Sequence, residues 1–179
     1  MTITLARAVA QDAVSQLAEE VGTLLWGCRP EAAAAAVAAQ LAPMLRRPDL
    51  LAPEQRVPQA ETYARNLLHA DPAGRFSVWA MVWAPGQGTV IHDHRCWCVM
   101  GVHDGTLTEE SYRPAPSGGD RLEPAGRLLC RPGAIRALHP GVANIHRVVN
   151  SGSETAVSIH IYGFDPALAC SSVGRVYAA

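Results

Sequence analysis

The sequence predicts a mainly β protein, a β-sandwich or small barrel, with a helical segment at its N-terminus. From Phe76 onward, short segments rich in aromatic and β-branched residues favour strands. Glycine, proline and asparagine separate these segments at close intervals, as turns between strands require. Nearer the start of the chain, apolar residues recur at helical spacing and an alanine run favours helix.

Two helices are expected at the N-terminus. The first covers residues 4–25, where helical spacing relates Leu5, Val9, Ala13, Leu17, Val21 and Leu24. The second begins near Pro30 in "RPEAAAAAVAAQLAPML". Pro48, Pro53 and Pro58 then interrupt regular structure. Residues 60–68, "AETYARNLL", are expected to form a short helical turn before a loop at "HADPAGR".

Strands are expected from Phe76 on, beginning with "FSVWAMVWAPG". The further strand segments are "TVIHDH", "WCVMGVHDGTLTEESY", "RLLCRPGAI", "IHRVVNSG" and "TAVSIHIYG". One domain is therefore expected over residues 1–179. Its parts would be a helical region at 1–70, a β-barrel core at 71–165 and a C-terminal tail at 166–179.

Composition excludes several classes of function. The net charge is −1, 49% of the residues are hydrophobic and 17% are charged, which describes a folded globular chain without a basic surface for nucleic acid or an anionic membrane. All 15 basic residues are arginine, so catalysis by a lysine is excluded. The N-terminus lacks the pattern of a secretory signal, and no apolar run is long enough to span a bilayer. Five cysteines, an odd number, argue against a disulfide framework, and we expect a cytoplasmic protein with reduced thiols.

Two histidines in "IHDH" are candidates for a metal site. On a strand, His92 and His94 point to the same face about 6–7 Å apart, whereas Asp93 points to the other face. A pair at this spacing is equally compatible with an ordinary polar patch. Imidazole ligands suit zinc, copper, iron or nickel, so the ligand type alone does not select the metal.

The spacing around this pair resembles the first motif of the cupin superfamily, whose members are jelly-roll β-barrels. Gly86 and Gly105 stand at the glycine positions of that motif, and Cys98 replaces its glutamate. Downstream, "HRVVN" resembles the end of the second cupin motif, with His146 and Asn150 at its two fixed positions.

This resemblance implies a metal held by three histidines, His92, His94 and His146, without a carboxylate. His139 is the alternative third ligand, although it precedes Pro140-Gly141 and is expected on a turn. A site with three protein ligands leaves open coordination positions, which is the condition for catalysis.

A row of polar side chains is expected on the strand "AVSIHIYG". Ser158, His160 and Tyr162 share one face and can form successive hydrogen bonds, whereas the other face is apolar. A solvent-exposed face is the alternative. We favour an interior row, because this face carries no charged residue and is bulky.

Five segments, in this order, resemble the cysteine dioxygenase family of thiol dioxygenases: Tyr63–Leu67, the strand ending at Trp83, "HDH", "HRV" and "SIHIY". The resemblance implies a ferrous ion on the three histidines and the oxidation of a small thiol by O₂ to its sulfinate. It also implies that Ser158, His160 and Tyr162 act in catalysis, that Arg65 pairs with the substrate carboxylate, and that Tyr63 lies near the same pocket.

The resemblance also suggests the hypothesis of a thioether crosslink between Cys98 and Tyr162, because animal members of the family join a cysteine near the iron to the active-site tyrosine. Cys96 is the rival partner, since strand alternation puts it on the same face as Cys98. Two ordinary buried thiols are the third reading. Trp97 and Met100 are expected to shape the pocket or to belong to the core.

The substrate is expected to be a small thiol carboxylate: cysteine, 3-mercaptopropionate or mercaptosuccinate. Gly163 follows the tyrosine, as in bacterial mercaptopropionate dioxygenases, which place glutamine where this chain has Arg65. A second guanidinium in the pocket, from Arg95, Arg147 or Arg175, would suit a dicarboxylic thiol. The alternatives are a cupin enzyme of another reaction type and a non-catalytic metal-binding cupin. A monomer is the default expectation.

Overall fold

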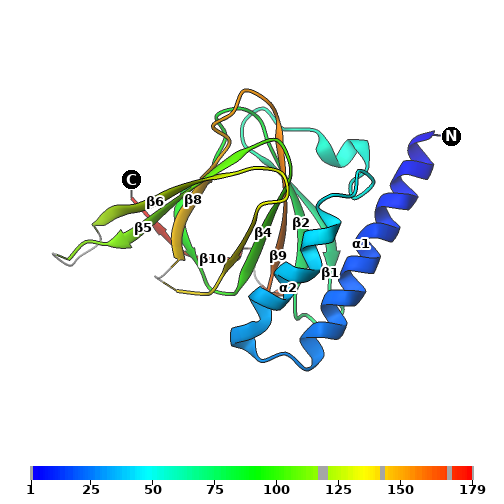
Figure 1. Cartoon of the computed structure of the whole chain (residues 1–179), viewed down its shortest axis with the longest axis horizontal. Helices are drawn as coiled ribbons and strands as arrows, with labels where there is room; N and C mark the ends of the chain where they lie inside the picture. The colour runs from blue at the N-terminus through cyan, green and yellow to red at the C-terminus, as the bar shows by residue number, and fades with distance from the viewer. Residues whose placement is uncertain (1, 117–120, 142–143, 169–170, 179) are drawn as a thin grey trace.

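The computed structural model describes residues 2–116, 121–141, 144–168 and 171–178. Two helices, α1 (Thr2–Trp26) and α2 (Pro30–Met44), precede a short 3-10 helix η1 (Pro53–Arg56) and a β-barrel (Figure 1). The strands are β1 (Ala64–Ala70), β2 (Ser77–Trp83), β3 (Ile91–His94), β4 (Cys98–Asp104), β5 (Leu107–Pro114), β6 (Leu122–Cys130), β7 (Ile135–Leu138), β8 (Ile145–Val149), β9 (Ala156–Tyr162) and β10 (Val173–Tyr177).

The strands form two five-stranded sheets, both antiparallel. One sheet has the order β1-β2-β9-β4-β7 and the other the order β10-β3-β8-β5-β6. Figure 1 shows the two sheets enclosing the barrel interior, with α1 and α2 on the outer side of the first sheet. The prediction of a mainly β, jelly-roll protein with helices packed on the barrel is therefore confirmed.

The central strands of the first sheet, β2, β9 and β4, are almost entirely buried, so both faces of β9 are covered. Val157, Ile159 and Ile161 point outward into a core shared with α1 and α2. Tyr162, at the end of the other face, belongs to a second core inside the barrel. All seven residues of β9 are buried, so the polar residues of its inner face lie in the barrel interior and not in solvent.

Two strands were missed by the sequence analysis. Residues 64–70 form β1, which pairs with β2, where a helical turn was expected at 60–68; that expectation is wrong. Pairing along the edge of the sheet outweighs the weak local helical preference of "YARNLL". Likewise, the expected C-terminal tail contains β10, which pairs with β3. The strands therefore extend beyond the expected limits of 71 and 165 on both sides.

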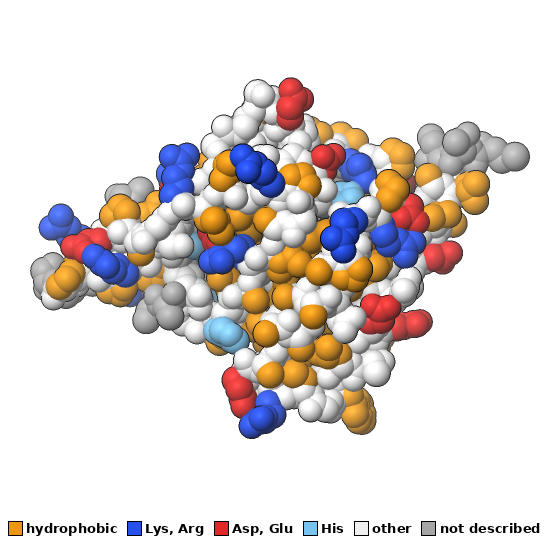
Figure 2. All heavy atoms as spheres, viewed as in Figure 1, with side chains coloured by type: hydrophobic (Ala, Val, Ile, Leu, Met, Phe, Trp, Pro, Cys, Tyr) orange, Lys and Arg blue, Asp and Glu red, His pale blue; other side chains and the backbone are white. Residues whose placement is uncertain are grey.

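The hairpin of β5 and β6 projects from the barrel and carries charges of both signs at its end, on the left of Figure 2. There Arg113 pairs with Glu123 at 3.3 Å. In the part of the chain that the structure describes, no helix is both long and apolar enough to cross a membrane. Cys28, Cys96, Cys98 and Cys130 are free thiols, and Cys170 lies outside the described residues.

Candidate functional site

Three histidines meet inside the barrel. His92 and His94 lie on β3, and His146 lies directly opposite His92 on the neighbouring strand β8. Their ligand nitrogens all lie within 4.8 Å of one another, and each of the three residues is at most 5% exposed. His139, the alternative third ligand, is exposed and outside this group. The pairing of β3 with β8 is what brings the sequence-distant His146 to the pair.

The hydrogen bonds of the imidazoles direct lone pairs toward the centre of this trio. Nδ1 of His92 donates to the Val90 carbonyl at 2.9 Å, and Nδ1 of His146 donates to the Glu109 carboxylate at 2.9 Å. In a neutral ring, donation from Nδ1 leaves a lone pair on Nε2. Nε2 of His94 lies 3.1 Å from Nε2 of His146. Two ligand nitrogens at this separation can bind one cation.

Two of the three imidazoles, those of His92 and His94, are neutral at pH 7, as metal ligation requires. Burial, followed by the charge of His146, lowers the pKa of His92 to about 4. Burial, followed by the charge of His92, lowers the pKa of His94 to about 3. Three clustered, buried imidazoles without a carboxylate ligand therefore fit a divalent transition metal with open coordination positions.

Glu109 is a buried carboxylate that the sequence analysis did not find. It lies on β5, is 1% exposed, and accepts hydrogen bonds from His146 Nδ1 and Arg136 Nε. Burial raises the pKa of Glu109, but the hydrogen bonds and charges of His146 and Arg136 outweigh burial and hold that pKa below its usual range. The available signal was strand alternation in "LTEESY", which places Glu109 and Glu110 on opposite faces.

The polar row of β9 forms a continuous hydrogen-bonded chain. The Trp83 indole N–H donates to Ser158 Oγ at 2.9 Å, and Ser158 Oγ lies 2.8 Å from His160 Nε2. Nδ1 of His160 lies 3.1 Å from the Tyr162 hydroxyl. Trp83 had been expected only as the end of a strand. The Ser158 hydroxyl donates to His160 Nε2, and His160 Nδ1–H donates to the Tyr162 oxygen. The Tyr162 hydroxyl hydrogen is therefore free to donate to another group.

The members of this row are held neutral. Burial is the main cause that lowers the pKa of His160 to about 3, and the charges of His146 and Arg65 add to it. Burial also raises the pKa of Tyr162 well above its ordinary value. A phenol that stays protonated at neutral pH can donate a hydrogen bond to a bound molecule.

Cys98 stands directly opposite Tyr162 on the neighbouring strand β4. Its thiol is buried, and burial raises the pKa of the thiol well above its usual range, whereas the Tyr162 side chain acts to lower that pKa. Cys96 lies in the bend before β4 and not on a strand, so the alternation argument does not apply to it. Of the two cysteines, Cys98 is therefore the one that pairs with Tyr162 across neighbouring strands.

A cavity of about 280 Å³ opens onto the three histidines. Residues from both sheets and from the C-terminal segment line it, among them Tyr63, Arg65, Met100, Cys98, His160, Tyr162, Ser172 and Val173. Met100 is also 1% exposed, so it belongs to the core and to the cavity wall. Trp97 packs instead on the core beneath the helices.

Arg65 brings a positive charge to the cavity. Its guanidinium lies over the Trp79 ring, 5.0 Å from the ring centroid. No carboxylate of the described chain lies within ion-pair distance of it. Tyr63 stacks on Trp83 with ring centroids 4.2 Å apart, and burial raises the pKa of its phenol. A guanidinium without a protein counter-ion, in the same cavity as three clustered histidines, is suited to bind an anionic ligand.

The other three candidate arginines face away from the cavity. Arg95 donates to the Val173 carbonyl at 2.9 Å, and Arg147 pairs with Glu110 at 2.5 Å. Arg175 lies over the Tyr177 ring. Among the arginines that the structure describes, only Arg65 lines the cavity. The sequence left open whether one of these three arginines reaches the pocket, and none of them lines the cavity.

Asp93 fastens the C-terminal segment to the site. Its side chain lies away from the three imidazoles, as strand alternation predicts, and accepts from the Arg175 N–H at 2.7 Å and the Tyr177 hydroxyl at 2.8 Å. These bonds hold β10 beside β3. Val173 and the residues just before it form part of the cavity wall, so Asp93 helps to close the site.

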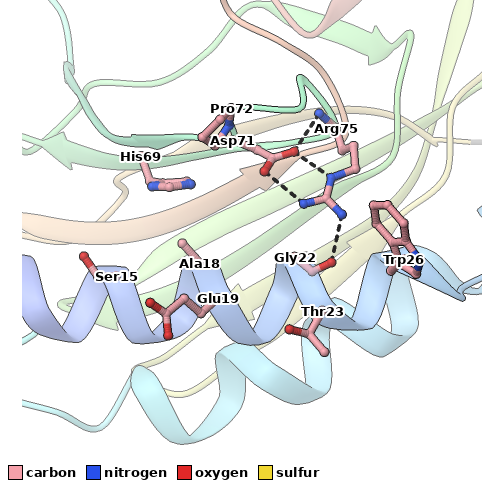
Figure 3. Close-up of a pocket in the computed structure, with 10 residues that line it drawn as sticks. All are labelled: Ser15, Ala18, Glu19, Gly22, Thr23, Trp26, His69, Asp71, Pro72 and Arg75. Atoms are coloured by element: carbon pink, nitrogen blue, oxygen red, sulfur yellow. Dashed lines mark hydrogen bonds and ion pairs between the residues drawn. The ribbon is translucent and has the colours of Figure 1, made fainter.

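A wider cavity of about 730 Å³ lies outside the barrel, between α1 and the turn joining β1 to β2 (Figure 3). Its lining residues are Ser15, Ala18, Glu19, Gly22, Thr23, Trp26, His69, Asp71, Pro72 and Arg75. Arg75 joins the two walls, pairing with Asp71 at 2.7 Å and donating to the Gly22 carbonyl at 2.9 Å. None of the three clustered histidines lines this cavity, so it is separate from the candidate site.

Comparison with known proteins gives a family match. Residues 56–173 match the family model described as cysteine dioxygenase type I. The cysteine dioxygenases type 1 of Bos taurus and Homo sapiens are each 31% identical over 103 residues, covering 56% of this chain and 50% of theirs. The chain thus spans about half the length of the curated relatives it matches.

Matches among solved structures include an uncharacterized conserved protein with a double-stranded β-helix domain from Klebsiella pneumoniae. It is 17% identical, has a TM-score of 0.49, and the match covers 70% of this chain and 93% of that chain. A Cupin 2 conserved barrel domain protein from Salinispora arenicola is 22% identical, with a TM-score of 0.44 and coverage of 59% and 78%.

Metal binding should depend on His146 and not on His139. We expect His146→Ala to weaken the binding of a divalent metal by roughly 100-fold or more, because it removes one of three ligands. His139→Ala should leave affinity unchanged, since its side chain is remote from the trio. Metal content after dialysis, measured by elemental analysis, checks both variants. Equal metal content in parent and His146→Ala protein would contradict the assignment.

Proposed function

The chain belongs to the cysteine dioxygenase type I family, and from this premise we propose that it is an iron-dependent thiol dioxygenase. One observation supports the proposal most strongly. An unpaired guanidinium, a protonated phenol and three clustered imidazoles border the same small cavity. These groups suit a small thiol carboxylate bound at a metal. The guanidinium suits its carboxylate, the imidazoles suit the metal cation that binds its thiolate, and the phenol can donate a hydrogen bond to the bound molecule.

His92, His94 and His146 would hold the ion. A bound ferrous ion would supply a cation that lowers the pKa of the substrate thiol and an open position for dioxygen. The overall reaction converts the thiol and one O₂ molecule into the sulfinic acid: the sulfur loses four electrons, and both oxygen atoms become bonded to it. The absence of a carboxylate ligand leaves more positive charge for an anionic thiolate to balance.

Arg65 would bind the substrate carboxylate through two parallel hydrogen bonds, and its stacking on Trp79 limits its motion. Because Arg65 is the one described arginine in the cavity wall, we propose a substrate with a single carboxylate. Cysteine and 3-mercaptopropionate meet this requirement, whereas mercaptosuccinate carries two carboxylates.

Tyr162 would donate its hydroxyl hydrogen into the cavity, toward the reacting atoms. His160 orients the phenol by donating from Nδ1, and Ser158 and Trp83 in turn fix the orientation and tautomer of His160. Burial keeps this chain neutral, so it can hold a proton at Tyr162 Oη throughout the neutral pH range. The β10 segment would help to exclude water from the site.

Oxygen uptake tests the proposal directly. Iron-loaded protein incubated in air with cysteine or 3-mercaptopropionate should consume one O₂ per thiol and form the sulfinate, with mercaptosuccinate reacting more slowly. Zinc-loaded protein is the control and should consume none, because zinc has no redox chemistry. If iron is bound and none of the three thiols is oxidised, the protein is a metal-binding cupin and not a thiol dioxygenase.

Arg65→Gln should lower kcat/KM for the preferred thiol carboxylate by roughly 10- to 100-fold, the loss expected for hydrogen bonds to a charged group. The effect should appear mainly in KM, since the carboxylate is remote from the reacting sulfur. Arg147→Gln is the matched control, because that guanidinium pairs with Glu110 outside the cavity. Equal steady-state kinetics for parent and Arg65→Gln protein would rule out this role.

We also propose that turnover forms a thioether between Cys98 and Tyr162. The bond would replace the thiol hydrogen and one ring hydrogen, with O₂ accepting the two electrons. After turnover, the intact mass should fall by two hydrogen atoms. Cys98→Ala should abolish this change and Cys96→Ala should retain it. An unmodified Cys98 peptide from fully active protein would exclude the crosslink.

A further inference from the structure

Behind one of the three clustered imidazoles lies a carboxylate with no solvent access. We propose that Glu109 is a positioning residue that orients His146 toward the metal and supplies, one ring away from the metal, the negative charge that Cys98 does not provide at the glutamate position of the cupin motif. This inference rests on the metal site within the proposed function. It does not depend on which thiol is oxidised, or on whether one is.

The strand register brings the two residues together. Ser111 on β5 stands opposite His146 on β8, and Glu109 lies two residues before Ser111, on the same face of the sheet. The Glu109 side chain therefore reaches diagonally to the imidazole, where Oε1 accepts from Nδ1 at 2.9 Å. Two ordinary antiparallel strands are enough to produce this contact, without an irregular loop.

Both carboxylate oxygens of Glu109 are engaged. While Oε1 accepts from His146, Oε2 accepts from Arg136 Nε on strand β7 of the opposite sheet. An ionised carboxylate that is 1% exposed is costly to bury unless it is paired in this way. Arg136, with 37% of its side chain exposed, meets part of that cost by reaching in from the surface.

The three imidazoles differ in the hydrogen-bond partner of their Nδ1 atoms. The partner of His92 is a backbone carbonyl, and His94 Nδ1 has no hydrogen-bond partner among the described residues. Of the three, His146 alone has an anionic partner. A carboxylate at Nδ1 fixes the tautomer with its lone pair on Nε2 and raises the basicity of that nitrogen. His146 should therefore be the strongest ligand of the set.

Glu109 could instead serve only to join the two sheets through Arg136. The two roles differ in what they predict. A purely structural ion pair affects the unfolding of the metal-free protein and leaves the intrinsic metal affinity unchanged. A positioning carboxylate affects the metal affinity of the folded protein, whatever its contribution to stability.

The test compares Glu109→Gln with Glu110→Gln in the full chain. Glu110, the next residue, faces outward and pairs with Arg147, so it is a matched control. Iron(II) affinity is measured anaerobically by competition with a chromogenic chelator, without any thiol. We expect Glu109→Gln to weaken binding 10- to 100-fold, as is typical for the partner of a ligating histidine, and Glu110→Gln to stay within about twofold. Thermal unfolding of each metal-free variant shows that it is folded.

Glu109→Asp provides a second reading if Glu109→Gln does not fold. It keeps the charge but shortens the side chain by one methylene, so it should lower affinity through lost contact with Nδ1. Folded Glu109→Gln or Glu109→Asp protein that binds iron(II) within twofold of the parent would overturn the inference. If the parent protein consumes no oxygen with any of the thiols, but the Glu109 variants lose iron(II) affinity as expected, the proposed function is wrong and the role of Glu109 stands.

Discussion

The site depends on three buried imidazoles that meet inside the barrel. Their ligand nitrogens lie within 4.8 Å of one another, with two Nε2 atoms 3.1 Å apart. Nitrogens this close can bind one cation, and burial keeps His92 and His94 from protonating. The surrounding groups act on this centre: Glu109 supports one ring, Arg65 brings a positive charge, and Tyr162 brings a hydroxyl.

The fold makes this arrangement stable by covering one sheet on both sides. The apolar face of β9 packs beneath α1 and α2, and this packing secures the strand. The opposite face can then carry Ser158, His160 and Tyr162 in the barrel interior, where each polar atom is paired along one hydrogen-bonded chain. The N-terminal helices therefore contribute to the site indirectly, by burying the outer face of the strand whose inner face carries this polar row.

Local pattern predicted much of this architecture. Period-two alternation identified the histidine pair and the polar row, helical spacing identified the first helix, and Pro30 with the alanine run identified the second. Strands β1 and β10 were missed because each is an edge strand whose structure comes from pairing with a distant segment. Glu109 and Trp83 were missed as site residues for a related reason. Their partners, His146 and Ser158, are far away in sequence, so no local pattern records the contact.

X-ray absorption spectroscopy at the iron edge tests the central claim most directly. Ferrous protein prepared without oxygen should show three imidazole nitrogens as its protein ligands, with neither sulfur nor carboxylate from the chain. Addition of the preferred thiol should introduce one sulfur scatterer at bonding distance while the three imidazoles remain. A resting spectrum with a cysteine sulfur, or an unchanged first shell at saturating thiol, would contradict the account of how this site binds its substrate.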